Sequence, residues 1–359
     1  KTNYIRHISK LHLELAGKHD LIAVTESKIR SFFTQKISKN RASVFSLASR
    51  QKVLSNLGAG LPFPDVTHAY ANKLKFTYEE LFSATNHLLV TIASDETSFT
   101  RDFFSSSGVC NRIFAGTIDL FSNSVTSVIS HSYDAIGILT NLCVTRCYQN
   151  IMTERKEDAL NKYFDSMSSI LFSRFIEVAN MNVESINNAN LKNLSNELKD
   201  IRSHYITRRF AEFIASIIFL TAPRQGVKVF APAALLKRLR TAFGNLLKHL
   251  ATNFQTTAEK IIFLTNNYDL IITVIIERSE HSEESLHYMQ IRDNYTKKYI
   301  DIVLQKHFAQ LFKFVKDNTV EDDKGTRQIV KPKASEAQVL QVMEKFSKTW
   351  EQAIQTINV

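Results

Sequence analysis

Proline and glycine are scarce in this chain: its 359 residues include only 5 prolines and 9 glycines. The turns of β-rich and α/β folds draw heavily on these two residue types, so their scarcity argues against such folds. Long uninterrupted helices need the fewest of them. The composition therefore favours an all-α fold, and 44% hydrophobic with 22% charged residues is ordinary for a folded soluble protein.

Cysteines and long apolar runs are lacking as well. Three cysteines in a chain of this length do not form a disulfide framework, which fits a reducing cytosol. The most apolar run, 261–276, is interrupted by Asn266, Asn267 and Asp269 and is shorter than the ~20 residues that span a membrane. We expect no transmembrane helix. Because the chain opens at Lys1 without an apolar signal region, we interpret it as a fragment.

Motifs that carry catalysis are also missing. The sequence contains no HExxH, GxGxxG, GxxxxGK[ST] or GxSxG pattern. Cys143 and Cys147 are four residues apart but lack the second ligand pair of a zinc site, so we interpret them as small buried hydrophobic residues. The acidic runs 283–284 and 321–323 are interpreted as solvated or helix-capping charges. We predict no catalytic residue, cofactor or metal site, and a helical enzyme with an unrecognised site is the third alternative for function.

The net charge is +10, and the basic residues are spread along the chain with short clusters at 208–209 and 237–240. There is no Arg/Lys-rich tail and no basic-aromatic strand pattern, so we do not expect nucleic acid as a partner. A basic surface also suits acidic proteins or anionic lipid. A peripheral membrane-binding helical module that uses a basic face is therefore the second alternative for function.

Helical spacing runs through most of the chain. An irregular stretch near 40–75 contains a short helix at about 45–57, and an Asn-rich loop at 187–196 marks a candidate domain boundary. We predict helical bundles in 1–188 and a second bundle region in 189–359, truncated at its C-terminal end. A charged loop is expected at 321–332. Helices are expected at 77–104, at 109–152 with a kink near 131–137, and at 157–188 and 204–221. Further helices are expected from Pro232 to about 254, at 258–278, at 284–317 and, after the charged loop, to the C-terminus.

The helix expected at 204–221 has one apolar stripe with steps of four, three, four and three residues: Ile206, Phe210, Phe213, Ile217 and Leu220. The opposite face carries Arg208, Arg209 and Glu212, with Tyr205 beside them, and Arg208 is placed to pair with Glu212. Tyrosine and arginine are enriched at interfaces. We predict Tyr205, Arg208, Arg209 and Glu212 as partner-interface candidates; the alternative is a solvated helix face.

Two further helices carry patterns of interest. Asn266 and Asn267 lie in an apolar helix, where buried amides need partners, so we expect them to cap a loop or bond to an adjacent helix. In the last helix, apolar residues again step by four and three on one seam, which predicts packing against a neighbouring helix. That seam comprises Val339, Met343, Phe346, Trp350, Ala353 and Ile357.

Several segments together resemble the vacuolar protein sorting-associated protein 52 family. The two long blocks are HYITRRFAEF at 204–213 and FLTNNYDLIITVIIER at 263–278. Shorter matches extend the likeness in order along most of the chain: FSLASR at 45–50, FTYEELF at 76–82, YDAI at 133–136 and MNVES at 181–185. The long blocks are specific, whereas the short ones would be weak alone.

The resemblance implies an elongated rod of consecutive antiparallel helical bundles, as in multisubunit tethering complexes, and no enzymatic activity. It implies a scaffold subunit of the Golgi-associated retrograde protein complex and its endosomal recycling variant. This complex captures endosome-derived carriers at the cytoplasmic face of the trans-Golgi network. Sister subunits, Rab-family and Arf-like GTPases and SNAREs are the implied partners. By the same resemblance, we expect this chain to lack the N-terminal coiled coil of the family.

Overall fold

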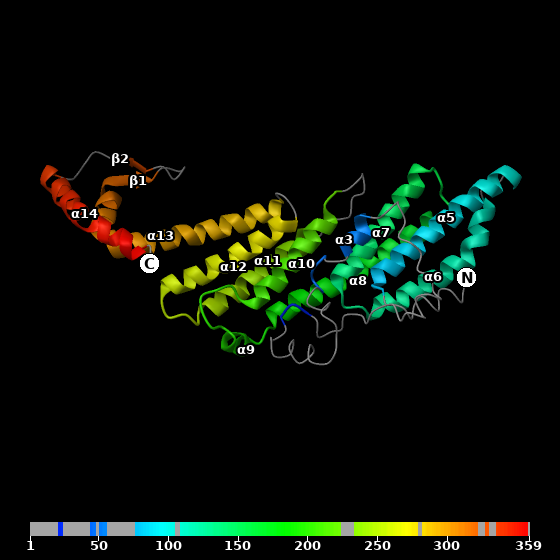
Figure 1. Ribbon diagram of the computed structural model, residues 1–359, viewed down its shortest axis with the longest axis horizontal. Coiled ribbons are helices and arrows are strands. Elements are labelled where there is room, and N and C mark those ends of the chain that lie inside the picture. The colour runs from blue at the N-terminus through cyan, green and yellow to red at the C-terminus, as the bar shows by residue number, and fades with distance from the viewer. Residues whose placement is uncertain are drawn as a thin grey trace.

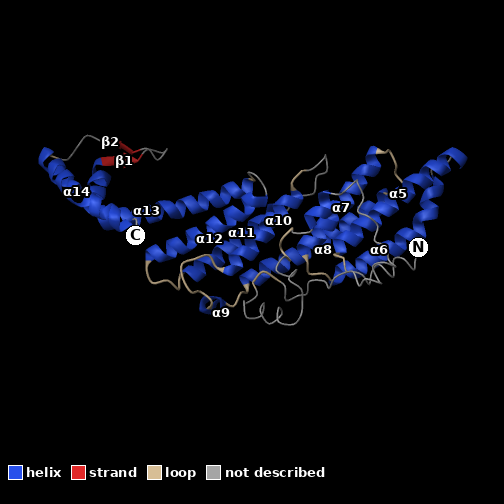
Figure 2. Cartoon of the chain, viewed as in Figure 1, coloured by secondary structure: helices blue, strands red, loops and turns tan. Residues whose placement is uncertain are grey.

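Helices make up almost all of the described structure (Figure 2). This computed structural model describes residues 21–23, 44–47, 50–55, 76–104, 108–223, 233–278, 282–321, 327–329 and 335–357. The helices are α3 (Arg50–Ser55), α5 (Tyr78–Phe104), α6 (Gly108–His131), α7 (Ala135–Glu154), α8 (Asn161–Asn187), α9 (Leu191–Asn196), α10 (Tyr205–Thr221), α11 (Ala233–Ala251), α12 (Thr257–Arg278), α13 (Glu283–Asn318) and α14 (Glu336–Ile357). The predicted all-α fold is confirmed.

The helices form an elongated assembly, with α5 and α6 toward one end and α14 at the other (Figure 1). Neighbours in sequence are also neighbours in space: α7 packs against α8, and α12 packs against α13. Longer-range pairs join α5 to α7, α8 to α11 and α10 to α12. This arrangement agrees with the predicted rod of antiparallel helices. The division into bundles at 188–189 stays a prediction.

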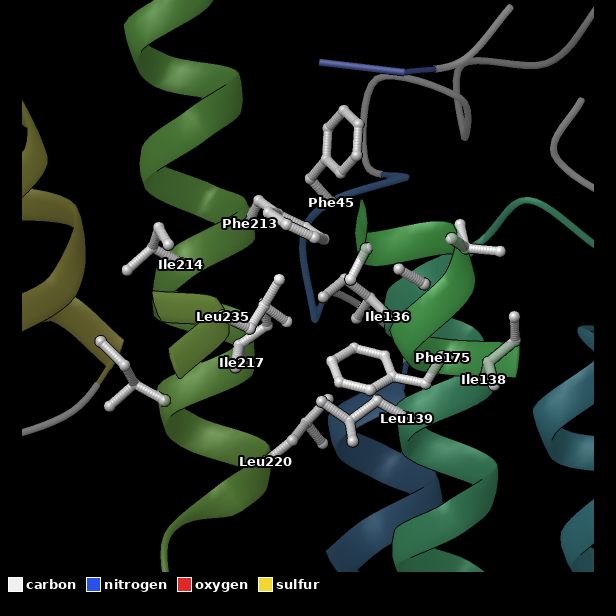
Figure 3. Packing of buried hydrophobic residues seen from close by; sticks show 14 of the residues in the cluster. Phe45, Ile136, Ile138, Leu139, Phe175, Phe213, Ile214, Ile217, Leu220 and Leu235 are labelled. Carbon is white, nitrogen blue, oxygen red and sulfur yellow. The ribbon is translucent and has the colours of Figure 1, made fainter. Parts of the chain in front are cut away.

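One cluster of buried side chains runs through the molecule from Ile22 to Tyr288. The predicted stripe of α10 is confirmed, since all five of its residues are buried. In Figure 3, Phe213 and Ile217 of α10 face a layer of α7 and α8 side chains that includes Ile136 and Phe175. Each fully buried side chain of this size contributes about 1.5–3 kcal/mol through removal from water, so this continuous core holds α7, α8 and α10 together.

Several local predictions need correction. The Asn-rich loop contains the short helix α9, because Asn190 caps it by accepting from the Asn193 N–H at 3.1 Å. Helix α6 begins at Gly108, one residue before the expected start at 109. Part of the expected charged loop forms a small antiparallel pair, β1 (Thr319–Glu321) with β2 (Arg327–Ile329). In the irregular stretch near 40–75, the structure describes a turn at 44–47 and helix α3, which lies within the short helix expected at about 45–57. Residues 40–43, 48–49 and 56–75 lie outside the described residues.

The end of the molecule that carries α14 differs from the rest. The backbone of α13 is interrupted at Phe308, whose φ of −128° and ψ of 33° are not helical. From Met289 onward, no described side chain is buried. Of the seam expected to pack in α14, Phe346 is half-buried, while Val339, Met343 and Trp350 are exposed. The side chains of Ala353 and Ile357 lie outside the described part of the structure.

Candidate functional site: a polar junction between distant segments

A largely buried arginine joins three parts of the chain that are far apart in sequence. Arg50 begins α3, and its Nε lies 2.8 Å from Oε1 of Glu79 in α5, while its Nη2 contacts Oδ2 of Asp134. Its Nη1 also donates to the carbonyl oxygens of Ser46 at 2.8 Å and Val44 at 3.2 Å. The three charged side chains are 13, 7 and 16% exposed. The guanidinium therefore fixes the 44–47 turn against α5 and α7.

Asp134 has two roles at this junction. It is the N-cap of α7, where its Oδ1 accepts from the Gly137 N–H at 2.8 Å, and it faces Arg50 through its other oxygen. Burial raises the pKa of Asp134 to about 6; Arg50 opposes this rise, and the nearby Glu79 adds to it. Two carboxyl groups share one guanidinium here, and the hydrogen bonds hold all three in place. The arrangement suits a structural anchor.

Gly137 permits the close approach of these groups. Substituting alanine for it and for a second glycine is expected to change stability in opposite directions. A Cβ at Gly137 would lie 2.5 Å from Oε1 of Glu79 and 3.0 Å from Oδ2 of Asp134, whereas one at the exposed Gly116 of α6 would meet nothing within 4 Å. We expect Gly137→Ala to lower the free energy of unfolding by about 1–3 kcal/mol, because the ion cluster must shift. We expect Gly116→Ala to raise it by about 0.5–1 kcal/mol through helix propensity. Urea unfolding of both variants measures these changes. A Gly137→Ala variant more stable than the wild type would contradict the close packing of Gly137 against Glu79 and Asp134.

A second polar cluster joins α10 to α12. Asn267 of α12 is fully buried; its Oδ1 accepts from the His204 N–H at 3.0 Å and from the Thr207 hydroxyl, and its Nδ2 donates to the Phe263 carbonyl at 2.7 Å. Nδ2 of the neighbouring Asn266 donates to the carbonyl of Ile201 at 2.9 Å. The prediction that these amides bond to an adjacent element is confirmed. The two long sequence blocks, 204–213 and 263–278, therefore meet in space.

Among the predicted interface residues, Arg208 is the most solvent-exposed, with 61% of its side chain accessible. It pairs as expected with Glu212, at 3.5 Å, and Glu212 also lies 3.4 Å from Nη2 of Arg278. Tyr205, the first residue of α10, packs against the core, and its ring centroid lies 4.5 Å from that of His204. These residues are thus held mainly by intramolecular contacts, and their role in partner binding stays a prediction.

Arg209 faces the N-terminal segments. Its Nε donates to the carbonyl of Ile22 at 3.2 Å and its Nη2 to that of Leu21 at 3.0 Å, while its guanidinium lies 5.0 Å from the ring centroid of Phe45. Phe45 in turn meets Phe213 edge to face, with centroids 5.4 Å apart. Arg209 therefore binds two segments that precede it by more than 150 residues.

Sequence reasoning did not bring Arg50, Glu79 and Asp134 together, although all three lie in segments that carry the family resemblance. The segment 181–185 binds the same N-terminal segment as Arg209, because Asn182 Oδ1 accepts from the Ile22 N–H at 3.2 Å and Ser185 Oγ from the Ala23 N–H at 3.5 Å. The available signal was an arginine and two acidic residues within those segments. The sequence spacing between these three residues does not predict that they are in contact.

The described ranges give no sign of a metal site or a membrane span. Nowhere in them do three or more His, Cys, Asp or Glu side chains gather so that they could hold a metal ion. No helix in these ranges combines the length and the apolar character needed to cross a bilayer. Cys143 is buried, with Sγ donating to the Leu220 carbonyl at 3.3 Å, and Cys147 is half-buried.

Known proteins are similar to this sequence over nearly its whole length. A family model described as "Vps52, C-terminal" matches residues 2–300. Vacuolar protein sorting-associated protein 52 A of Arabidopsis thaliana is 32% identical over 360 residues, which cover 99% of this chain and 49% of that protein. The Homo sapiens homolog of that protein is 26% identical over 363 residues, which cover 99% of this chain and 49% of the homolog. The Caenorhabditis elegans homolog is 28% identical over 335 residues, which cover 90% of this chain and 47% of the homolog.

The chain spans about half the length of the curated relatives it matches. No solved structure matches it. The family match extends from the N-terminal segments through the ion cluster and the α10–α12 junction into α13, so it includes every contact of the site described above. The chain belongs to the Vps52 C-terminal family.

Proposed function

We propose that this chain is part of a non-enzymatic scaffold subunit of a vesicle-tethering complex, acting in retrograde transport from endosomes to the trans-Golgi network. The observation that carries the proposal is membership of the Vps52 C-terminal family, whose match covers residues 2–300. The elongated arrangement of helices supports it, because a continuous buried core from Ile22 to Tyr288 makes a stiff spacer. The polar junction supports it as well, since it anchors N-terminal segments to the spacer.

The proposed partners are the sister subunits of the tethering complex, Rab-family and Arf-like GTPases, and SNAREs. The proposed location is the cytoplasmic face of trans-Golgi network and endosomal membranes, where the protein is peripheral. Several weak contacts within one complex raise the net affinity through effective concentration, which suits the capture of a carrier. On α10, Arg208 offers the most exposed side chain of the Tyr205, Arg208, Arg209 and Glu212 group for such a contact.

Co-purification tests the scaffold proposal directly. We expect the full-length protein, tagged and purified from cells, to bring down tethering subunits that mass spectrometry identifies. A tagged helical protein of similar size and charge serves as the control for nonspecific capture. If the protein recovers none of these subunits above that control, the proposed function is wrong.

One observation supports the alternative function, a helical module that binds membranes through a basic face. Helix α11 contains four lysines and arginines and no acidic residue, and the side chains of Lys237, Arg238 and Lys248 are exposed. Each basic residue near an anionic membrane contributes about 1 kcal/mol. Salt-sensitive flotation of the 359-residue chain with vesicles containing phosphatidylserine would favour this alternative, whereas its absence would favour the scaffold.

A further inference from the structure

Helix α14 presents apolar residues over a wider face than α13 covers. The half-buried residues Val342, Phe346 and Thr349 lie on one side, and the Phe346 ring centroid is 5.4 Å from that of Phe308 in α13. A second group of apolar side chains remains in contact with solvent. Its members, which we call the open seam, are Val339, Leu340, Met343, Trp350 and Ile354, with exposures of 40, 64, 54, 39 and 43%.

The open seam has the pattern of a helix-packing surface. Leu340, Met343, Trp350 and Ile354, together with Ser347, step by three, four, three and four residues, which is the spacing of a coiled-coil seam. No described side chain from Met289 onward is buried, so α14 and the adjoining part of α13 lack a core of their own. Amphipathic helices are stabilised by burial of such a face against another element.

The charges of α14 are distributed unevenly around this seam. At about 100° per residue, Glu336 lies within the open face, and Glu344 and Glu351 lie along its edge away from α13. The two lysines, Lys345 and Lys348, lie further round the helix. Glu344 pairs with Lys348 at 2.6 Å, but both side chains are about 70% exposed, and such a pair contributes little. The edge of the open seam is therefore acidic.

We propose that the open seam binds one amphipathic helix of another subunit, with apolar residues at three- and four-residue steps and Lys or Arg along the flank that faces Glu344 and Glu351. The inference rests on the proposed scaffold function. A second copy of this chain is a poorer partner. In an antiparallel pair the flanking glutamates of the two copies would face each other, and in a parallel pair they would face apolar positions.

Trp350 gives a direct readout, because it is the only tryptophan in the sequence. The probe is a tryptophan-free helical peptide of about six turns with leucine along its seam, made with lysine or with glutamate at the flanking positions. We expect the lysine peptide to shift the emission of Trp350 to shorter wavelength and to reduce its quenching by acrylamide. We expect it to bind roughly tenfold more tightly than the glutamate peptide at low ionic strength, and this difference should shrink in salt.

Matched variants separate this binding from general apolar adsorption. The Glu344→Lys/Glu351→Lys double variant should reverse the preference between the peptides, and Met343→Ser should weaken the binding of both. Lys345→Ala, on the other side of α14, should leave the affinities unchanged. Equal affinity for the two peptides, or no change in Trp350 emission, would overturn the proposal, as would a dimeric mass and a concentration-dependent emission shift of the chain alone.

The two proposals can fail independently. Co-purification without tethering subunits, combined with peptide binding, would reject the proposed function and leave the helix-binding surface in place. Recovery of the subunits by the full-length protein, combined with no peptide preference, would reject only the surface on α14.

Discussion

Replacing Arg50 by methionine should lower the free energy of unfolding by about 3–5 kcal/mol, the largest effect we expect from a single substitution. Methionine fills much of the same volume but carries no charge. Glu79 and Asp134 would then face each other across a buried site without their shared guanidinium, and the carbonyl oxygens of Val44 and Ser46 would lose a donor. Urea unfolding followed by circular dichroism measures the loss.

The matched control is Arg202→Met, because Arg202 is exposed and pairs with Asp200 at 3.5 Å. It should change stability by no more than about 0.5 kcal/mol. An Arg50→Met variant as stable as this control would show that the cluster is not an anchor.

The penalty should also depend on pH. Loss of the guanidinium raises the pKa of Asp134 further above the value of about 6 that it has beside Arg50. A raised pKa in the folded state stabilises the fold only while the carboxyl is protonated, so that contribution falls as pH rises above about 4 and is lost above the folded-state pKa. We therefore expect a smaller difference from the wild type at about pH 5 than at about pH 8.

Asn267→Leu should cost about 2–4 kcal/mol, although leucine matches asparagine roughly in volume. The substitution leaves the His204 N–H and the Thr207 hydroxyl without their shared acceptor in a fully buried position. Because the same amide joins α10 to α12, hydrogen exchange should increase at the start of α10 as well as in α12. Denaturant unfolding and exchange followed by mass spectrometry measure the two effects.

Two substitutions nearby serve as comparisons for the stability loss expected from Asn267→Leu. Asn266→Leu removes one bond, to the Ile201 carbonyl, from a partly buried side chain, so we expect about 1 kcal/mol. Asp269→Ala removes an exposed carboxylate that pairs with Arg292 at 3.2 Å, so we expect less than about 0.5 kcal/mol. If Asn267→Leu cost no more than Asp269→Ala, the buried network would not be what fixes the two helices.

Periodicity predicted the helices and their buried faces well where one helix packs within the core. The stripe of α10 followed from side-chain spacing alone, because burial on one face of a helix leaves a local pattern in sequence. The need of Asn267 for a partner followed from its apolar surroundings. Its partners, His204 and Thr207, did not, since they are 63 and 60 residues away.

The contacts of the ion cluster and the exposure of the apolar face of α14 were beyond prediction, for different reasons. Arg50 and Asp134 are 84 residues apart, and an ion pair at that separation leaves no periodic trace. The seam of α14 was predicted from its spacing, but spacing says only that a face is apolar. It does not say whether the neighbour that covers this face belongs to the same chain. In α9, one asparagine of the expected loop, Asn190, instead caps a short helix.

The interruption at Phe308 has a mechanical consequence. A helix bends most easily where its backbone departs from helical dihedral angles, and Phe308 is such a point in α13. Helix α13 links the region packed on α12 to an arm formed by its own C-terminal part and α14. If the open seam binds a helix as proposed, we expect a pull on that helix to change first the angle at Phe308. The arm would yield under load while the anchored spacer behind it kept its shape.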